Sequence, residues 1–218
     1  MWPRRPTRRG RVASHRYLGR PESDWIRCLS MQILGGALGP SDPHAEISVL
    51  EARLDLLQRF WPRNVEEVAG VLSNMAASFE EIGRIEDALR IKRTVYAHRV
   101  KRKGQDDEAT IRFGNNLSLA LIKNARFAEA KQFTRAHEPV ARRALGDRHS
   151  ETLRAVSILA EALYQDPAAP RADLLEAEAR LVGLLPTARI IYGPSNPQTQ
   201  VIETQLEHAR WKLAVFRT

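Results

Sequence analysis

The side chains best suited to catalysis or metal binding in this sequence are six histidines and a single cysteine, Cys28. The histidines are His15, His44, His98, His137, His149 and His208. Their spacing contains no H-E-x-x-H metal motif, and the sequence has neither a phosphate-binding P-loop nor a G-x-S-x-G nucleophile motif. We therefore predict that the chain is not an enzyme and that it holds no cofactor, metal or catalytic residue. We expect His149, in a turn between repeats, to have a capping or packing role, and Cys28 to be buried as a small apolar side chain.

The positive charge is concentrated at one end of the chain. The net charge is +8, and residues 1–20 contain seven arginines and no acidic residue, which leaves +1 for everything after residue 20. Four interpretations of this segment stay open: an organelle-targeting signal, a nuclear-localisation or nucleic-acid arm held by phosphate contacts, a solvated tail, and a mispredicted start of translation. The apolar runs are too short for a membrane span, so we expect a cytoplasmic protein, or a nuclear or organellar one if the basic segment is a targeting signal.

Several positions recur at a fixed distance along the chain. Gly104 and Gly146 lie 42 residues apart, Gly193 follows 47 residues later, and a threonine stands six residues after each of them. Small residues recur in the same register: Ala76, Ser118 and Ala160 share one position, and Ala88, Ala130 and Ala177 share another. Small side chains let two helices approach closely, so the repeat unit is predicted to be a pair of helices.

Apolar residues at spacings of three and four predict the helices themselves. Val68, Leu72, Met75 and Phe79 show this pattern clearly. Pro139 and Pro186 are equivalent positions inside second helices, and the pair Gly35–Gly36 is expected to end the first helix. The predicted helices cover residues 24–34, 44–60, 64–82, 85–103, 107–124, 127–144, 149–165, 171–191 and 197–216.

The pattern resembles the tetratricopeptide repeat in the 42-residue form that is typical of kinesin light chains. The resemblance rests on the first-helix motif at 115–121, the second-helix motif at 126–130, and the turns at 145–152 and 192–199. It covers about residues 38–216 and implies an all-α, right-handed solenoid of antiparallel helix pairs. The heptad coiled coil of a true kinesin light chain is not found here, so a motor role is not expected.

The sequence predicts the following organisation. Residues 1–23 form a basic tail, 24–61 form N-terminal helices that cap the array, and 62–218 form the repeats. The repeats divide into 62–103, 104–145, 146–192 and a terminal helix at 193–218. Glu207 stands at a small-residue position of that last helix, which fits an outer face in contact with water.

The resemblance also implies a site. In such arrays the first helices line a concave groove that binds a peptide, and the positions that match this role are Asn74, Arg112, Asn115, Asn116, Lys123, Arg154 and Ser157. An amide can pair with any peptide backbone because it both donates and accepts hydrogen bonds. We therefore predict a protein–protein interaction scaffold. The alternatives are a nucleic-acid-associated adaptor that uses residues 1–20, and a fragment of a larger multidomain signalling protein.

Overall fold

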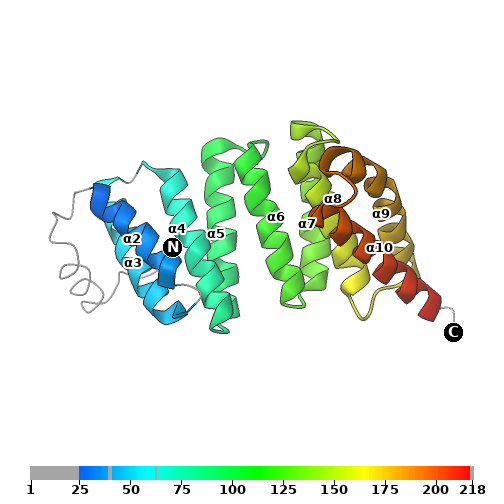
Figure 1. Cartoon of the computed structure of the whole chain (residues 1–218), viewed down its shortest axis with the longest axis horizontal. Helices are drawn as coiled ribbons and strands as arrows, with labels where there is room; N and C mark the ends of the chain where they lie inside the picture. Colours follow the sequence, from blue (N-terminus) through cyan, green and yellow to red (C-terminus); the bar gives the residue numbers. More distant parts are fainter. Residues whose placement is uncertain (1–24, 39–40, 62, 217–218) are drawn as a thin grey trace. The chain divides into compact units, whose positions relative to one another are not determined.

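The computed structural model describes residues 25–38, 41–61 and 63–216, and every regular element in these ranges is an α-helix (Figure 1). From α3 onward, each helix begins and ends within one residue of its predicted limits. None of the helices described combines the length and the apolar character that crossing a membrane requires. The helices are α2 (Trp25–Leu38), α3 (Pro43–Phe60), α4 (Val65–Glu81), α5 (Ile85–Lys103), α6 (Glu108–Lys123), α7 (Phe127–Leu145), α8 (Ser150–Gln165), α9 (Arg171–Tyr192) and α10 (Pro197–Val215).

The recurring glycines and threonines build the turns between helix pairs. Gly104, Gly146 and Gly193 have φ angles of +88°, +84° and +94°, a region that favours glycine because it has no Cβ atom. Three residues later, the side chain of Asp107, His149 or Asn196 accepts a hydrogen bond from a backbone N–H of the next helix. This confirms the capping role predicted for His149. The three threonines are buried, and the hydroxyl of each one donates a hydrogen bond within or next to the turn.

The chain divides into two compact units, of which the first ends at Val95 and the second begins at Tyr96. In the first unit, α3 packs against both α2 and α4. Met31 of α2 and Leu56 of α3 are buried in a small core. Arg53 is also buried there, and its guanidinium donates to Gln32 and Glu67. Cys28 is fully buried, as predicted.

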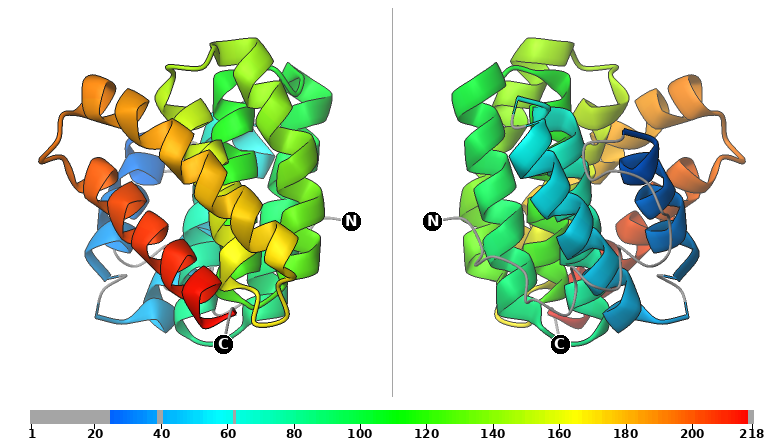
Figure 2. Two further views of the ribbon diagram at one scale, coloured as in Figure 1. Left: turned by 90° about the vertical axis from the view of Figure 1, so that its right-hand side faces the viewer. Right: turned by 90° about the vertical axis from the view of Figure 1, so that its left-hand side faces the viewer.

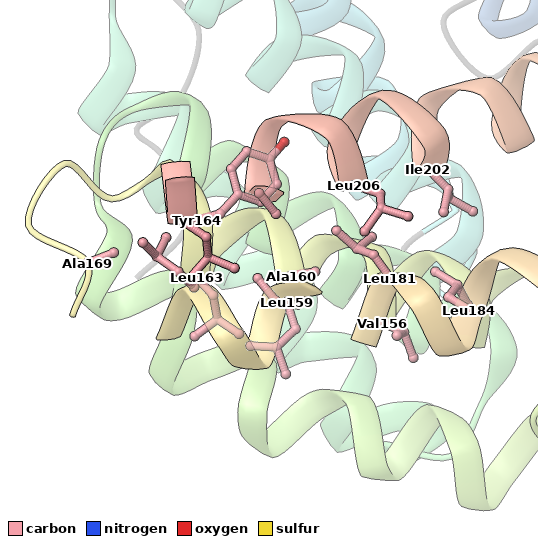
Figure 3. Packing of buried hydrophobic residues seen from close by; sticks show 14 of the residues in the cluster. Val156, Leu159, Ala160, Leu163, Tyr164, Ala169, Leu181, Leu184, Ile202 and Leu206 are labelled. Atoms are coloured by element: carbon pink, nitrogen blue, oxygen red, sulfur yellow. The ribbon is translucent and has the colours of Figure 1, made fainter. Parts of the chain in front are cut away.

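The second unit contains a larger core. Leu159 and Leu163 of α8, Leu181 of α9 and Leu206 of α10 belong to one buried cluster, which Figure 3 shows. Both repeated small positions are buried in this unit, as the repeat pattern predicts. Pro139 and Pro186 lie inside α7 and α9, on exposed turns, and Glu207 is exposed. The predicted repeat limits and the division at residue 62 stay predictions.

One local prediction was wrong. The pair Gly35–Gly36 does not end the first helix, because α2 continues to Leu38. Gly35 is buried, and a Cβ atom there would lie 3.6 Å from Leu50 of α3. A glycine inside a helix costs only about 1 kcal/mol relative to alanine. Packing of α2 against α3 therefore outweighs the local preference for a helix end. The predicted basic tail lies outside the described residues.

Candidate functional site

The first helices of the second unit are α6, α8 and α10, and α8 contacts both of the others. Arg112 of α6, Arg154 of α8 and Val201 of α10 are equivalent positions of successive repeats, at distances of 42 and 47 residues. We call the surface formed by these helices the first-helix face, and define it by Arg112, Asn116, Lys123, Arg154, Glu161, Val201 and His208. Six of the seven residues predicted to bind a peptide lie on α6 and α8.

Asn115 is completely buried and joins α6 to α8. Its Nδ2 atom donates to the backbone carbonyl of Glu151 at 3.0 Å and to the Glu151 carboxylate at 2.8 Å. Its Oδ1 atom is buried without a hydrogen-bond partner. The structure therefore places this predicted binding residue between two helices, and its amide donor is used within the chain.

Asn116 and Arg154 are brought together by the same pair of helices. The Asn116 Oδ1 atom accepts a hydrogen bond of 2.8 Å from Nη2 of Arg154, whose Nη1 atom lies 3.6 Å from Glu151. Both residues are half-buried. Their mutual bond fixes the guanidinium on the first-helix face, and part of it stays accessible to water.

Ser157 adds a separate hydrogen-bonded link, from α8 to α10. It is buried, and its hydroxyl donates to Oε1 of Gln205 at 2.6 Å. The Gln205 Nε2 atom then donates to Glu161 at 3.1 Å. Burial raises the pKa of Glu161, and the donors from Gln205 and Gln165 oppose that shift. Gln205 stands at the repeat position of Asn116, two repeats later, and its role as a link between α8 and α10 was not predicted.

Two cations of the first-helix face are not used in this network. Arg112 and Lys123 are both exposed at opposite ends of α6. The positive charge of Lys123 opposes the rise that burial causes in the pKa of Glu161. No hydrogen bond or ion pair of Arg112 is found within the described part of the chain.

Asn74 belongs to the first unit, on α4, and its side chain is exposed. It is the position equivalent to Asn116, 42 residues earlier in the chain. Its neighbour Ser73 turns its hydroxyl to the Ala69 carbonyl at 2.8 Å, so it is tied to its own helix. The role of Asn74 in binding a peptide stays a prediction.

The α10 end of the first-helix face has a different character. Val201 is 48% exposed, and Trp211, ten residues further along α10, is 64% exposed. The His208 ring is also exposed, and its centroid lies 6.4 Å from that of the buried Tyr164 ring, whose pKa burial raises to about 12. The sequence prediction did not include these residues. Val201 could have been predicted, because it occupies the same repeat position as Arg112 and Arg154.

The first-helix face therefore runs from a cationic end on α6, across the Asn116–Arg154 pair, to an apolar and aromatic end on α10. Among the described residues, no group of three or more histidine, cysteine, aspartate or glutamate side chains is arranged to hold a metal ion.

Two of three comparisons with known proteins find nothing. No protein-family model matches the sequence. A search of curated proteins also finds no match.

Solved structures do match. The nearly identical TPR-like repeats of a presumed kinesin light chain from Podosopora anserina superpose with a TM-score of 0.68 and 16% identity, over 91% of this chain and 90% of that one. A point-substituted form of the same repeats gives a TM-score of 0.70 at 16% identity, over 90% and 89%. BtubC (BKLC) from P. vanneervenii gives 0.59 at 14% identity, over 97% and 93%. The chain therefore has the all-α solenoid fold of the tetratricopeptide-like repeats of kinesin light chains, as its 42-residue period predicted.

Proposed function

We propose that this chain is a non-catalytic scaffold that binds a peptide or protein partner on the first-helix face of its second unit. The observation that carries the proposal is a set of hydrogen bonds between helices beside two exposed cations that form no part of it. Asn115, Asn116, Arg154 and Ser157 are held by bonds between helices, whereas Arg112 and Lys123 stay exposed. The tetratricopeptide-like fold supports the same general role.

This arrangement suits a partner that carries an acidic group and an apolar group. A guanidinium binds a carboxylate with two parallel hydrogen bonds, and Arg112 is free to form them. Val201 and Trp211 offer apolar surface on α10. Because the network already orders Asn116 and Arg154, these two side chains lose little conformational entropy when a partner binds. The exposed Asn74 offers the equivalent position in the first unit.

The test uses the full chain as bait, followed by titration of the recovered partner. Replacing Arg112 or Lys123 by alanine should lower the affinity roughly tenfold, because a charge-assisted hydrogen bond contributes about 1.5–3 kcal/mol. The melting temperature of Arg112→Ala should not change, since Arg112 forms no hydrogen bond or ion pair within the described residues. Lys123→Ala should lower it only slightly, because the exposed Lys123 acts on Glu161 through its charge alone. Arg171→Ala is the matched control, because Arg171 is exposed at the start of the second helix α9. Equal losses in all three variants would contradict the proposal.

The seven arginines of residues 1–20 support a second candidate, an adaptor that associates with nucleic acid through its basic arm. Neutralised phosphates make affinity fall steeply with salt concentration. Titrations at two ionic strengths, with and without residues 1–20, separate the two candidates. A steep salt dependence that disappears with the deletion, together with inert Arg112→Ala and Lys123→Ala variants, would favour the arm and contradict binding at the first-helix face.

A further inference from the structure

The outward side of α9 carries an apolar stripe that none of the described residues of the second unit covers. One side of α9 packs into the core through Leu174, Ala177, Leu181, Leu184 and Ala188. The opposite side of α9 carries a row of seven exposed residues, none of which is charged or polar. We define the α9 stripe as Ala172, Leu175, Ala179, Val182, Gly183, Pro186 and Ile190.

The exposure of this stripe is substantial. Leu175 is 41% exposed, Val182 46% and Ile190 74%. The stripe extends over about 27 Å at the helical rise of 1.5 Å per residue. In the left-hand view of Figure 2, α9 crosses the front of the second unit beside α10. A continuous apolar surface of this kind on a folded domain is typical of an interaction site.

The equivalent side of α7 shows that the repeat itself does not require an apolar stripe. Pro139 of α7 corresponds to Pro186 of α9, 47 residues later. With the same shift, the exposed Arg135 and Arg143 correspond to Val182 and Ile190. The same helix face is thus charged in one repeat and apolar in the next. The change from arginine to valine and isoleucine is specific to α9.

The order of residues along the α9 stripe fits a second copy of the same helix. Two antiparallel α9 helices, related by a two-fold axis between Val182 and Gly183, would place Leu175 opposite Ile190 of the other copy. Ala179 would lie opposite Pro186, and Val182 opposite Gly183. Each pair sets a larger side chain beside an apolar one or beside a glycine, as an isologous interface requires.

Charged residues along one edge of the stripe fit the same arrangement. Glu178 and Arg189 both lie on the edge that faces α10, where they pair with Arg210 and Glu203. In an antiparallel pair, this edge of one helix faces the same edge of the other. Glu178 would then lie within about 3 Å along the axis of the position opposite Arg189. The side chain of Arg189 is 53% exposed and can be shared between both carboxylates.

We propose that the α9 stripe is a self-association surface, on which two copies of this chain form an antiparallel, two-fold symmetric dimer. The stripe is separate from the first-helix face, so both copies in the dimer can still bind a partner there.

Sedimentation equilibrium of the full chain tests the dimer. The variant copies the arginines that α7 carries at the equivalent positions: Val182→Arg with Ile190→Arg. It should raise the dimer dissociation constant at least about tenfold, because the arginines would be buried at the interface. Val201→Arg with Trp211→Arg, on the exposed side of α10, is the control and should leave the dimer intact. Both variants should keep the wild-type circular dichroism spectrum. A chain that stays monomeric at all accessible concentrations would overturn the proposal, as would a dimer that depends on the α10 residues.

Single cysteines test the orientation. Val182→Cys places its two thiols close to the two-fold axis, whereas Leu175→Cys places them about 22 Å apart along the axis. Mild oxidation should therefore link Val182→Cys into a covalent dimer and leave Leu175→Cys unlinked. The wild-type chain, whose Cys28 is buried, is the blank. Equal linking of both variants would contradict the antiparallel pair. Flotation of a monomeric chain with phosphatidylcholine vesicles would instead identify a lipid-binding surface and overturn self-association.

Discussion

The buried ring of His137 determines that position 114 must be a glycine. His137 is 3% exposed, and its Nε2–H donates to the Ile111 carbonyl at 3.1 Å. The ring stacks on Phe133 at 5.4 Å. A Cβ atom at position 114 would lie 2.2 Å from this ring, so only glycine leaves room for it. The histidine therefore serves packing between α6 and α7, where no metal or catalytic role was expected for it.

Burial lowers the pKa of His137, with a smaller opposing effect from the hydrogen bond to Ile111. The unfolded chain takes up a proton at this residue as the pH falls through about 6.5. The folded chain takes it up only at lower pH, so the free energy of unfolding should decrease as the pH falls below that value. His137→Leu should remove this contribution, since the equivalent residue of α9 is the buried Leu184.

Urea denaturation at several pH values between about 7 and 5 measures the effect. The wild-type chain should lose more stability over this range than His137→Leu does. His208→Gln is the control, because His208 is exposed. If the wild type and His137→Leu respond to pH identically, His137 is not held neutral by its surroundings.

At the scale of the helix, polar residues at the edge of the core join one first helix to the next. Asn115 and Asn116 are neighbours on α6, and both of them face α8. Thr134 of α7 adds a buried bond of 3.1 Å to Ser118, at one of the small positions of the repeat. These contacts fix the rotation of each helix about its own axis, which apolar packing alone would define less sharply.

The rotation of α6 can be tested with two adjacent residues. Leu117 is 3% exposed, and its replacement by alanine should reduce stability by about 2–5 kcal/mol. Asn116 is half-buried and accepts one hydrogen bond from Arg154, so Asn116→Ala should cost only about 1 kcal/mol. Chemical denaturation of both variants measures the difference. Losses of the same size would mean that α6 presents a different side to the core.

At the scale of the whole molecule, each helix pair is stable only when a neighbour covers its apolar edge. In the second unit, α10 provides this cover through Ile202, Leu206 and Leu213, which share one core with α8 and α9. Its outer side carries Glu203 and Arg210, which pair with Arg189 and Glu178 of α9. The last helix therefore presents an apolar side to the core, and its remaining surface combines polar residues with the exposed Val201 and Trp211.

Removing residues 194–218 should lower the melting temperature and cause aggregation, because Leu181 and Leu184 would lose their cover. Ile190 is not part of that buried edge, since it is 74% exposed with α10 in place. Circular dichroism and light scattering measure both effects. To separate this from self-association, the truncation is compared in the Val182→Arg and Ile190→Arg background. A soluble chain with unchanged melting temperature would show that α10 is not a cap.

The sequence by itself determined the helices, their pairing and the turns. Apolar residues at spacings of three and four define the buried side of each helix, and a glycine followed by a capping residue defines where the next one starts. The tertiary structure decided which polar residues are free. Asn115 and Ser157 have the same local pattern as exposed residues, yet both are buried. Gly35 lies within a helix because Leu50 packs against it. These outcomes depend on how neighbouring helices are rotated and spaced, and that information is not contained in the periodicity of any single segment.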